Sequence, residues 1–166
     1  MKISVFFILF YCSLSAQYLD SLQTIIQSKS IEYSTKQEII DSFFEANKPK
    51  IDSLELAECY HEYGKWFFKR SKIGKKTYNL QKAIHFTKES LTFKEYLKVP
   101  ENSLKRTLYN LAFFYFESGN YYQVIHNCQK IKEFSEVDKR TLYALGLLSK
   151  TYKKTGDYHK ALLNSN

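Results

Sequence analysis

The cysteines and histidines are the residues of this chain best suited to thiol or metal chemistry. Cys59 and Cys128 lie far apart in the sequence and form no Cys-x-x-Cys pair, so the spacing of a zinc site is missing. Cys128 falls on the apolar side of a predicted helix. We therefore expect both to be buried free thiols, with a disulfide formed after export as the alternative.

Two of the four histidines occupy matching places in the sequence. His85 and His126 each follow an isoleucine directly, in two successive predicted helices. Stacked helices could bring them together as a metal pair, but no further His or Cys follows either one at i+3 or i+4. The favoured interpretation is that this position of the repeat simply tolerates histidine. No metal or cofactor is expected.

Nucleophilic catalysis lacks its usual sequence signals. The chain has no G-x-S-x-G motif and no glycine-rich phosphate loop. The acid pairs Glu55–Glu58 and Glu133–Glu136 are expected to be solvated charges on helix surfaces. The sequence therefore predicts no catalytic site and a protein that is not an enzyme.

The elements that must position any functional residue are revealed by a repeat. The stretch 108–124, LYNLAFFYFESGNYYQV, returns as 145–161, LGLLSKTYKKTGDYHKA, and six landmarks share one offset of 37 residues. The six pairs are Leu108 and Leu145, Leu111 and Leu148, Tyr115 and Tyr152, Gly119 and Gly156, Tyr121 and Tyr158, and Val124 and Ala161. Self-similarity at a fixed period indicates an array of repeated supersecondary units.

The spacing within each copy predicts a helix, a tight turn and a second helix. Leu108, Leu111 and Tyr115 lie at i, i+3 and i+7, which is one face of a helix. Gly119 and Gly156 stand where a helix end needs a left-handed residue. The second helix of each copy is expected to begin with its tyrosine, Tyr121 or Tyr158, on the buried side. The interpretation depends on these two tyrosines occupying equivalent positions in successive hairpins.

These residues resemble the tetratricopeptide repeat (TPR) family, whose pattern places Leu and a small residue, Tyr, a turn Gly with a following aromatic, and a small residue in the second helix. The segment GDYHKAL carries this pattern most specifically. Departures are the bulky Val124, the absence of a closing Pro and a slightly long period. The resemblance implies an all-α fold, an α-solenoid of antiparallel hairpins wound as a right-handed superhelix, with repeats at 101–137 and 138–166, the last cut short in its second helix.

A third, weaker copy precedes these two at 51–100. Tyr60, Tyr63 and Gly64 fit its first helix, and Ala83 fits its second. Because the distance from Gly64 to Ala83 is seven residues longer than the matching distance in the next repeat, a long inner loop is expected at 71–79. Upstream, 17–50 is expected to form two capping helices or a degenerate repeat.

Composition and charge limit the classes of function. A chain of 166 residues with 44% hydrophobic and 17% aromatic residues fits one domain with a sizeable core, and two Pro and five Gly argue against disorder. The net charge of +8, one unit of which is Lys2, favours acidic partners. The lysines are scattered and no nucleic-acid motif accompanies them, so no nucleic-acid partner is expected.

The first sixteen residues are typical of a secretory signal peptide. Lys2 precedes a nine-residue apolar run, Ile3 to Tyr11, and small residues lead to a cleavage site after Ala16. Cys12 would suit a lipoprotein, but the bulky Tyr11 before it does not. The run is too short to span a bilayer. We therefore expect export to the periplasm or the extracellular space, and no membrane span in the mature chain.

The exposed faces of the first helices are the predicted binding site. In TPR proteins these helices line a concave groove, and Lys or Arg interleaved with Tyr and Phe would suit an acidic and apolar peptide. The predicted groove residues are His61, Lys65, Lys69, Arg106, Tyr109, Asn110, Phe113, Lys150 and Lys153, flanked by Phe68, Phe116, Tyr143 and Lys154. Alternatively, the phenylalanines pack on neighbouring helices and the lysines are only solvated.

Two further resemblances concern a longer protein. The leader and the Lys-, Tyr- and Phe-rich composition look like proteins of the Bacteroidota, and ELAECYHEYGKWFFKR resembles the N-terminal region of proteins that end in a CHAT peptidase domain. The abrupt end after the short apolar segment 161–163 predicts a C-terminal continuation. The lead hypothesis is an exported TPR scaffold that binds a protein or peptide; the alternative is a regulatory region of a CHAT peptidase or of a membrane sensor kinase.

Overall fold

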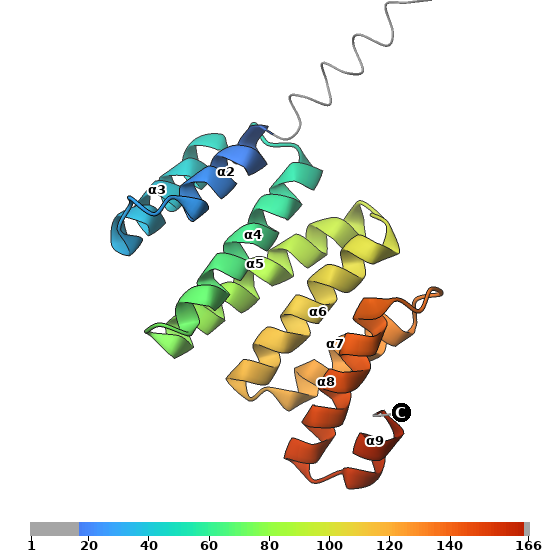
Figure 1. Cartoon of the computed structure of the whole chain (residues 1–166). Helices are drawn as coiled ribbons and strands as arrows, with labels where there is room; N and C mark the ends of the chain where they lie inside the picture. The colour runs from blue at the N-terminus through green and yellow to red at the C-terminus, as the bar shows by residue number, and fades with distance from the viewer. Residues whose placement is uncertain (1–16, 165–166) are drawn as a thin grey trace, which may run out of the picture.

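The computed structural model describes residues 17–164, and the expected leader, 1–16, lies outside the described residues (Figure 1). The described part is all-helical and contains no strand. Its helices are α2 (Gln17–Gln27), α3 (Tyr33–Asn47), α4 (Ser53–Ser71), α5 (Lys76–Tyr96), α6 (Glu101–Ser118), α7 (Tyr121–Lys132), α8 (Lys139–Thr155) and α9 (Tyr158–Leu163). None of these helices is long and apolar enough to cross a membrane.

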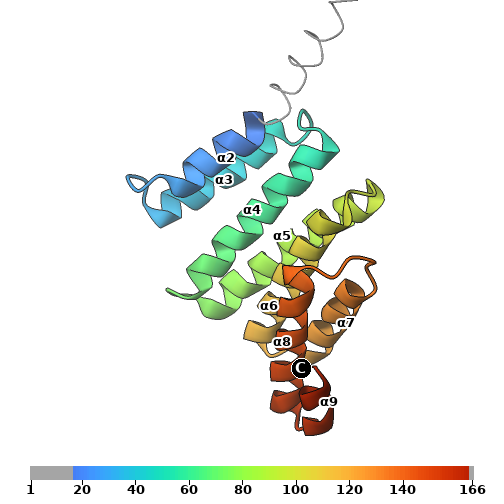
Figure 2. The same ribbon diagram turned by 45° about the vertical axis from the view of Figure 1, so that its right-hand side comes forward.

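Helices that follow one another in the sequence pack against one another. The α4–α5 contact is the most extensive; α6 packs on α5 and α7, and α8 packs on α6, α7 and α9. At the N-terminal end, α2 packs on both α3 and α4. Figures 1 and 2 show the helices succeeding one another from α2 and α3 at one end to α9 at the other. The predicted helical class is therefore confirmed.

Polar caps and glycines fix the helix ends. Side chains of Asp52, Asn120, Asp138 and Asp157 each accept a backbone N–H in the first turn of the helix that follows, and a cap of this kind contributes about 1 kcal/mol. The glycines that end α6 and α8 have φ of +80° and +83°. Both predicted turn glycines are thus left-handed, which an L side chain would adopt only with strain.

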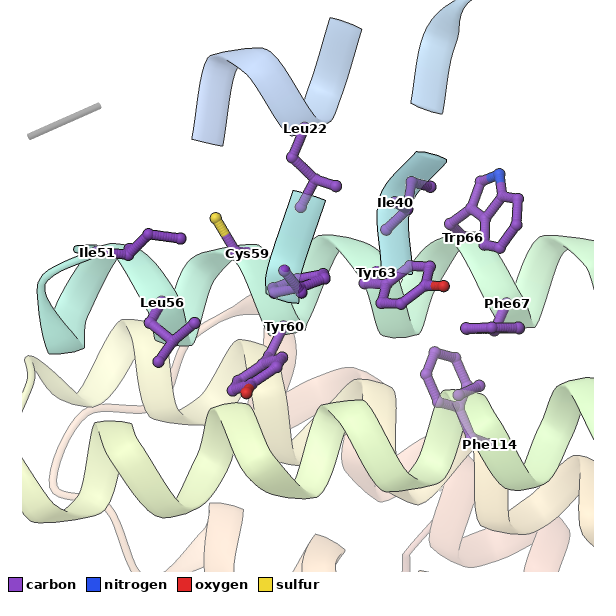
Figure 3. Packing of buried hydrophobic residues seen from close by; sticks show 12 residues of the cluster. Leu22, Ile40, Ile51, Leu56, Cys59, Tyr60, Tyr63, Trp66, Phe67 and Phe114 are labelled. Carbon is purple, nitrogen blue, oxygen red and sulfur yellow. The ribbon is translucent and has the colours of Figure 1, made fainter. Parts of the chain in front are cut away.

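Buried side chains form two apolar clusters. The first is aromatic and centres on α4, with Tyr63, Trp66 and Phe67; Figure 3 shows Leu22 approaching α4 from one side and Phe114 from the other. The second centres on α6, α7 and α8 and is mostly aliphatic. Ile84 and Phe113 pack against both clusters, as a half-buried boundary between them.

The long inner loop expected at 71–79 is wrong. The connection is only 72–75, because α4 continues to Ser71 and α5 begins at Lys76. Most of the extra length is helix, mainly one added turn at the start of α5. The anchor of the alignment holds, since a Cβ on Gly64 would lie 3.1 Å from the carbonyl oxygen of Ala83. The sides of α4 and α5 that face each other were therefore predicted correctly, whereas the length of the connection between them was not.

The expected equivalence of Tyr121 and Tyr158 holds for the backbone but not for the surroundings. Each is the first residue of its helix after a capping Asn or Asp. Tyr121 is half-buried with its ring 5.8 Å from that of Phe116, whereas Tyr158 is 71% exposed. The residue that corresponds to Phe116 is Lys153, which offers no ring to pack on. The prediction that Tyr158 lies on the buried side is therefore wrong, and this pair counts against the scaffold hypothesis.

Candidate functional site

A polar cluster lies between α4, α5 and α6, where the sequence predicted solvated charge at Glu58 and groove residues at His61, Arg106 and Asn110. It consists of Glu58, His61, Lys94, Arg106, Thr107 and Asn110. Lys94 is fully buried, and its Nζ lies 2.7 Å from Oε1 of Glu58; Nη2 of Arg106 lies 2.6 Å from the other oxygen. Burial alone would raise the pKa of Glu58, but hydrogen bonds and charge from both cations hold that pKa below its usual range.

His61 is the neutral centre of this cluster. Burial, followed by the charges of Lys94 and Arg106, lowers the pKa of His61 to about 2. Its Nε2 lies 3.3 Å from the amide nitrogen of Asn110, and its Nδ1 lies 3.4 Å from Oγ1 of Thr107. Because the amide nitrogen is a donor, Nε2 accepts and Nδ1 carries the proton.

Thr107 completes the hydrogen bonding. Its hydroxyl donates to the carbonyl oxygen of Ser103 at 3.1 Å, and its two lone pairs accept from Lys94 Nζ, at 3.1 Å, and from His61. A histidine that stays neutral at physiological pH and is enclosed on both ring nitrogens has no free position for proton transfer to a ligand. The cluster therefore joins α4, α5 and α6 and offers no acid–base chemistry.

This arrangement corrects the groove prediction for two residues, His61 and Arg106. His61 is only 1% exposed, so it does not line a surface. Arg106 is partly exposed, but its guanidinium is committed to Glu58. Glu55, predicted to be solvated, is buried and accepts the backbone N–H groups of Tyr18 and Leu19. Glu55 and His61 lie on the inward face of α4. The sequence analysis placed them on the outside because their side chains are polar.

A row of aromatic rings crosses the first helices of the three predicted hairpins. Phe68 of α4, Phe113 and Tyr109 of α6 and Tyr143 of α8 follow one another, with ring centroids 5.5, 6.4 and 5.8 Å apart. We call these four residues the aromatic ladder. Three of the rings are half-buried and Tyr143 is exposed. Burial raises the pKa of Tyr109, so its phenol stays neutral at physiological pH.

Lysines flank the aromatic ladder at both ends. Lys72 Nζ lies 4.8 Å from the ring centroid of Phe68, and Lys139 Nζ lies 5.5 Å from that of Tyr143. The lysines cover one face of each terminal ring, and the Phe68 ring also stacks on that of Phe114 at 4.4 Å. Lys72 is also paired with Glu117 at 2.6 Å, so its charge is partly compensated.

The structure brings together some of the predicted groove residues and not others. Tyr109 and Phe113 belong to the aromatic ladder, and Phe113 packs on Phe68, as the alternative interpretation expected. Lys65 is held by Glu62 at 2.7 Å. Lys69, Lys150 and Lys153 are exposed on α4 and α8. Tyr143, which was expected only to flank the groove, is the most exposed ring of the aromatic ladder.

The other chemistry-bearing residues form no site within the described range. Cys59 and Cys128 are buried free thiols, as predicted, and burial raises the pKa of each to about 12. His85 and His126 are exposed. Across residues 17–164, no group of His, Cys, Asp and Glu could hold a metal ion. A protonated buried thiol is a poor nucleophile.

No family model, curated protein or solved structure matches the chain. The resemblance to the TPR family, and those to a CHAT peptidase or sensor-kinase region, therefore remain predictions from the residues quoted above.

Proposed function

We propose that this chain is a TPR-type interaction scaffold that binds an extended peptide, with apolar and acidic side chains, along the first helices α4, α6 and α8. The aromatic ladder is the observation that carries the proposal. Four rings from three helices form one continuous row, and a row of this kind supplies large contact area at low entropic cost. The proposal assigns no catalytic step to the chain.

The charge of the same surface sets the expected partner. Lys69, Lys150 and Lys153 are exposed on the helices that carry the aromatic ladder, and the whole chain has a net charge of +8. Positive charge at the rim accelerates association with acidic partners, while the rings supply most of the affinity. Acidic peptides should therefore bind better than basic ones, and less well in high salt.

The proposed solenoid of hairpins is supported by the local geometry. Gly119 and Gly156 turn the chain in the same way at two successive hairpins. Within hairpins, small residues lie at the close approaches: Gly64 faces Ala83 across α4 and α5, and Ala112 is fully buried on α6. Repetition of one unit with one turn geometry is what a superhelical stack requires.

Export with cleavage after Ala16 is part of the proposal. In the described part of α2, the backbone N–H groups of Tyr18 and Leu19 donate to the carboxylate of Glu55 on α4, at 2.8 and 2.9 Å. Mass spectrometry of protein secreted from an expression host tests the cleavage position.

Selection from a phage-displayed peptide library tests the binding surface. We expect enrichment of peptides that combine Asp or Glu with aromatic or aliphatic residues. Binding should weaken by about tenfold in Tyr109→Ser and in Tyr143→Ser, whereas Tyr96→Ser on α5, where the ring is more exposed than that of Tyr143, should be neutral. Failure to select any peptide, or equal binding by all three variants, would reject the proposal.

A further inference from the structure

A pocket lies at the N-terminal end of α6, beside the start of α8. Its volume is about 330 Å³, and it is lined by Pro100, Asn102, Ser103, Arg106 and Arg140. We call it the arginine pocket. Among the described residues no acidic side chain lines it. Two guanidinium groups therefore face one small space without a carboxylate in it.

Both guanidinium groups are held in place, and Arg140 keeps donors to spare. Arg106 uses Nη2 toward Glu58, and its Nε is buried without a hydrogen-bond partner in the described structure. Arg140 uses Nη1, which donates to the Asn102 side-chain oxygen and lies 3.7 Å from Asp138. A guanidinium has five N–H donors in a fixed plane. Arg140 therefore has donors left for a ligand, whereas Arg106, held by Glu58 and with its Nε buried, contributes mainly its charge.

The carboxylates that hold these arginines are shared with buried lysines. Glu58 also pairs with Lys94 at 2.7 Å, and Asp138 lies 4.0 Å from Nζ of Lys105. Both lysines are fully buried, so water screens their charge poorly. Four cations thus share two carboxylates, which leaves two positive charges uncompensated.

One further acid lies near this end of α6. Glu101 accepts a hydrogen bond from Ser135 at 3.3 Å and does not line the pocket. If its charge is counted, one positive charge is still uncompensated.

We propose that the arginine pocket binds a small tetrahedral oxyanion of the phosphate class. Phosphate oxygens can accept from the Arg140 guanidinium beside the positive charge of Arg106. The Ser103 hydroxyl, which lies 3.5 Å from Oε1 of Glu58, would have to turn from that carboxylate to donate to the phosphate. The negative charge of phosphate balances the excess positive charge. The first turn of α6, which no side chain caps, adds backbone N–H groups to the same space. Asn102, Ser103 and Arg140 lie outside the aromatic ladder and the predicted groove, so the proposal stands independently of peptide binding.

Calorimetric titration of the folded protein with inorganic phosphate, in chloride buffer at constant ionic strength, tests the site. Saturable binding is expected, with acetate binding more weakly. Arg140→Gln should weaken phosphate binding by about tenfold, and Lys88→Gln, which removes an exposed charge on α5, should leave it unchanged. Arg140 is the residue of choice because Arg106→Gln would also free Glu58; circular dichroism checks that each variant folds.

Vesicle flotation separates a soluble phosphate from a lipid headgroup. Binding to vesicles of phosphatidate in phosphatidylcholine, together with weak binding of free phosphate, would assign the pocket to a headgroup; binding of free phosphate alone would assign it to a soluble ester. Either result supports the oxyanion site if Arg140→Gln weakens the binding by about tenfold. No binding in either assay, or binding that Arg140→Gln leaves intact, overturns the proposal.

Discussion

The ammonium nitrogen of Lys94 lies 2.7 Å from Oε1 of Glu58, although the Lys94 side chain has no exposed surface. A buried lysine is tolerated only where a carboxylate and further hydrogen bonds compensate its lost hydration. Here Glu58 supplies the charge and Thr107 supplies a second acceptor. The ion pair therefore ties α5 to α4 and α6 in a single geometry.

Substituting either partner of this ion pair should lower the free energy of unfolding, but by unequal amounts. Glu58→Gln leaves Lys94 buried without a counter-ion and should lower the free energy of unfolding by about 3 kcal/mol. Lys94→Met should cost less, about 1 kcal/mol, because Glu58 is partly exposed and keeps Arg106. Urea denaturation measures both, with Glu95→Gln, whose pair with Lys130 is exposed at 3.5 Å, as the neutral control. Equal losses for the two core variants would contradict this account.

The titration of His61 gives a second prediction. Its pKa is lowered to about 2 in the folded protein, whereas an unfolded histidine titrates near pH 6.5. Below that pH the unfolded chain therefore binds a proton that the folded chain does not. Stability should be constant above about pH 6.5 and fall by about 1.4 kcal/mol per pH unit below it.

Urea denaturation from pH 7 to pH 5, before most carboxylates titrate, isolates this effect. His61→Gln should remove the slope, at some cost in stability at pH 7 because the hydrogen bonds to Thr107 and Asn110 are disturbed. His126→Gln, on an exposed position of α7, should keep the slope. A wild-type free energy of unfolding that does not change over this range would show that His61 is protonated in the folded state.

Two glycines should respond in opposite ways to alanine. A Cβ on Gly64 would lie 2.4 Å from Oγ1 of Thr87, whereas Gly146 of α8 has nothing within 4 Å. Gly64→Ala must push α4 away from α5 and should destabilise the protein by about 2 kcal/mol. Gly146→Ala should stabilise it by about 0.5–1 kcal/mol, because alanine is the better helix former. Thermal unfolding of both variants checks the sign of each change.

Much of the fold could be predicted from the sequence, because caps, turn glycines and apolar spacing are local signals. Asp52, Asn120, Asp138 and Asp157 are of residue types that favour helix starts and do cap helices, and Cys128 lies on the buried side of α7 as predicted. The polar cluster could not be predicted. Lys94 and Glu58 pair across two helices, and nothing in the sequence of either helix distinguishes them from solvated charges.

The aromatic ladder could likewise be predicted from the sequence only in part. Tyr109 and Phe113 share a helix face, which the spacing of four residues indicates. The row that they form with Phe68 and Tyr143 depends on how α4, α6 and α8 are placed side by side. That placement depends on long-range packing, which a period of 37 residues suggests but does not determine.

The contact between Glu55 and the start of α2 gives the last prediction. The carboxylate accepts the N–H groups of Tyr18 and Leu19, so it satisfies two of the donors that every helix start leaves open, and its negative charge opposes the positive end of the helix dipole. Glu55→Ala should therefore loosen α2 without unfolding the remaining helices. Hydrogen exchange should accelerate for α2 amides by about tenfold or more, which corresponds to a loss of at least about 1.4 kcal/mol, while amides of α6 to α8 stay protected. Glu45→Ala, on an exposed position of α3, should leave α2 unchanged; faster exchange over the whole chain in Glu55→Ala would instead show that Glu55 supports the global fold.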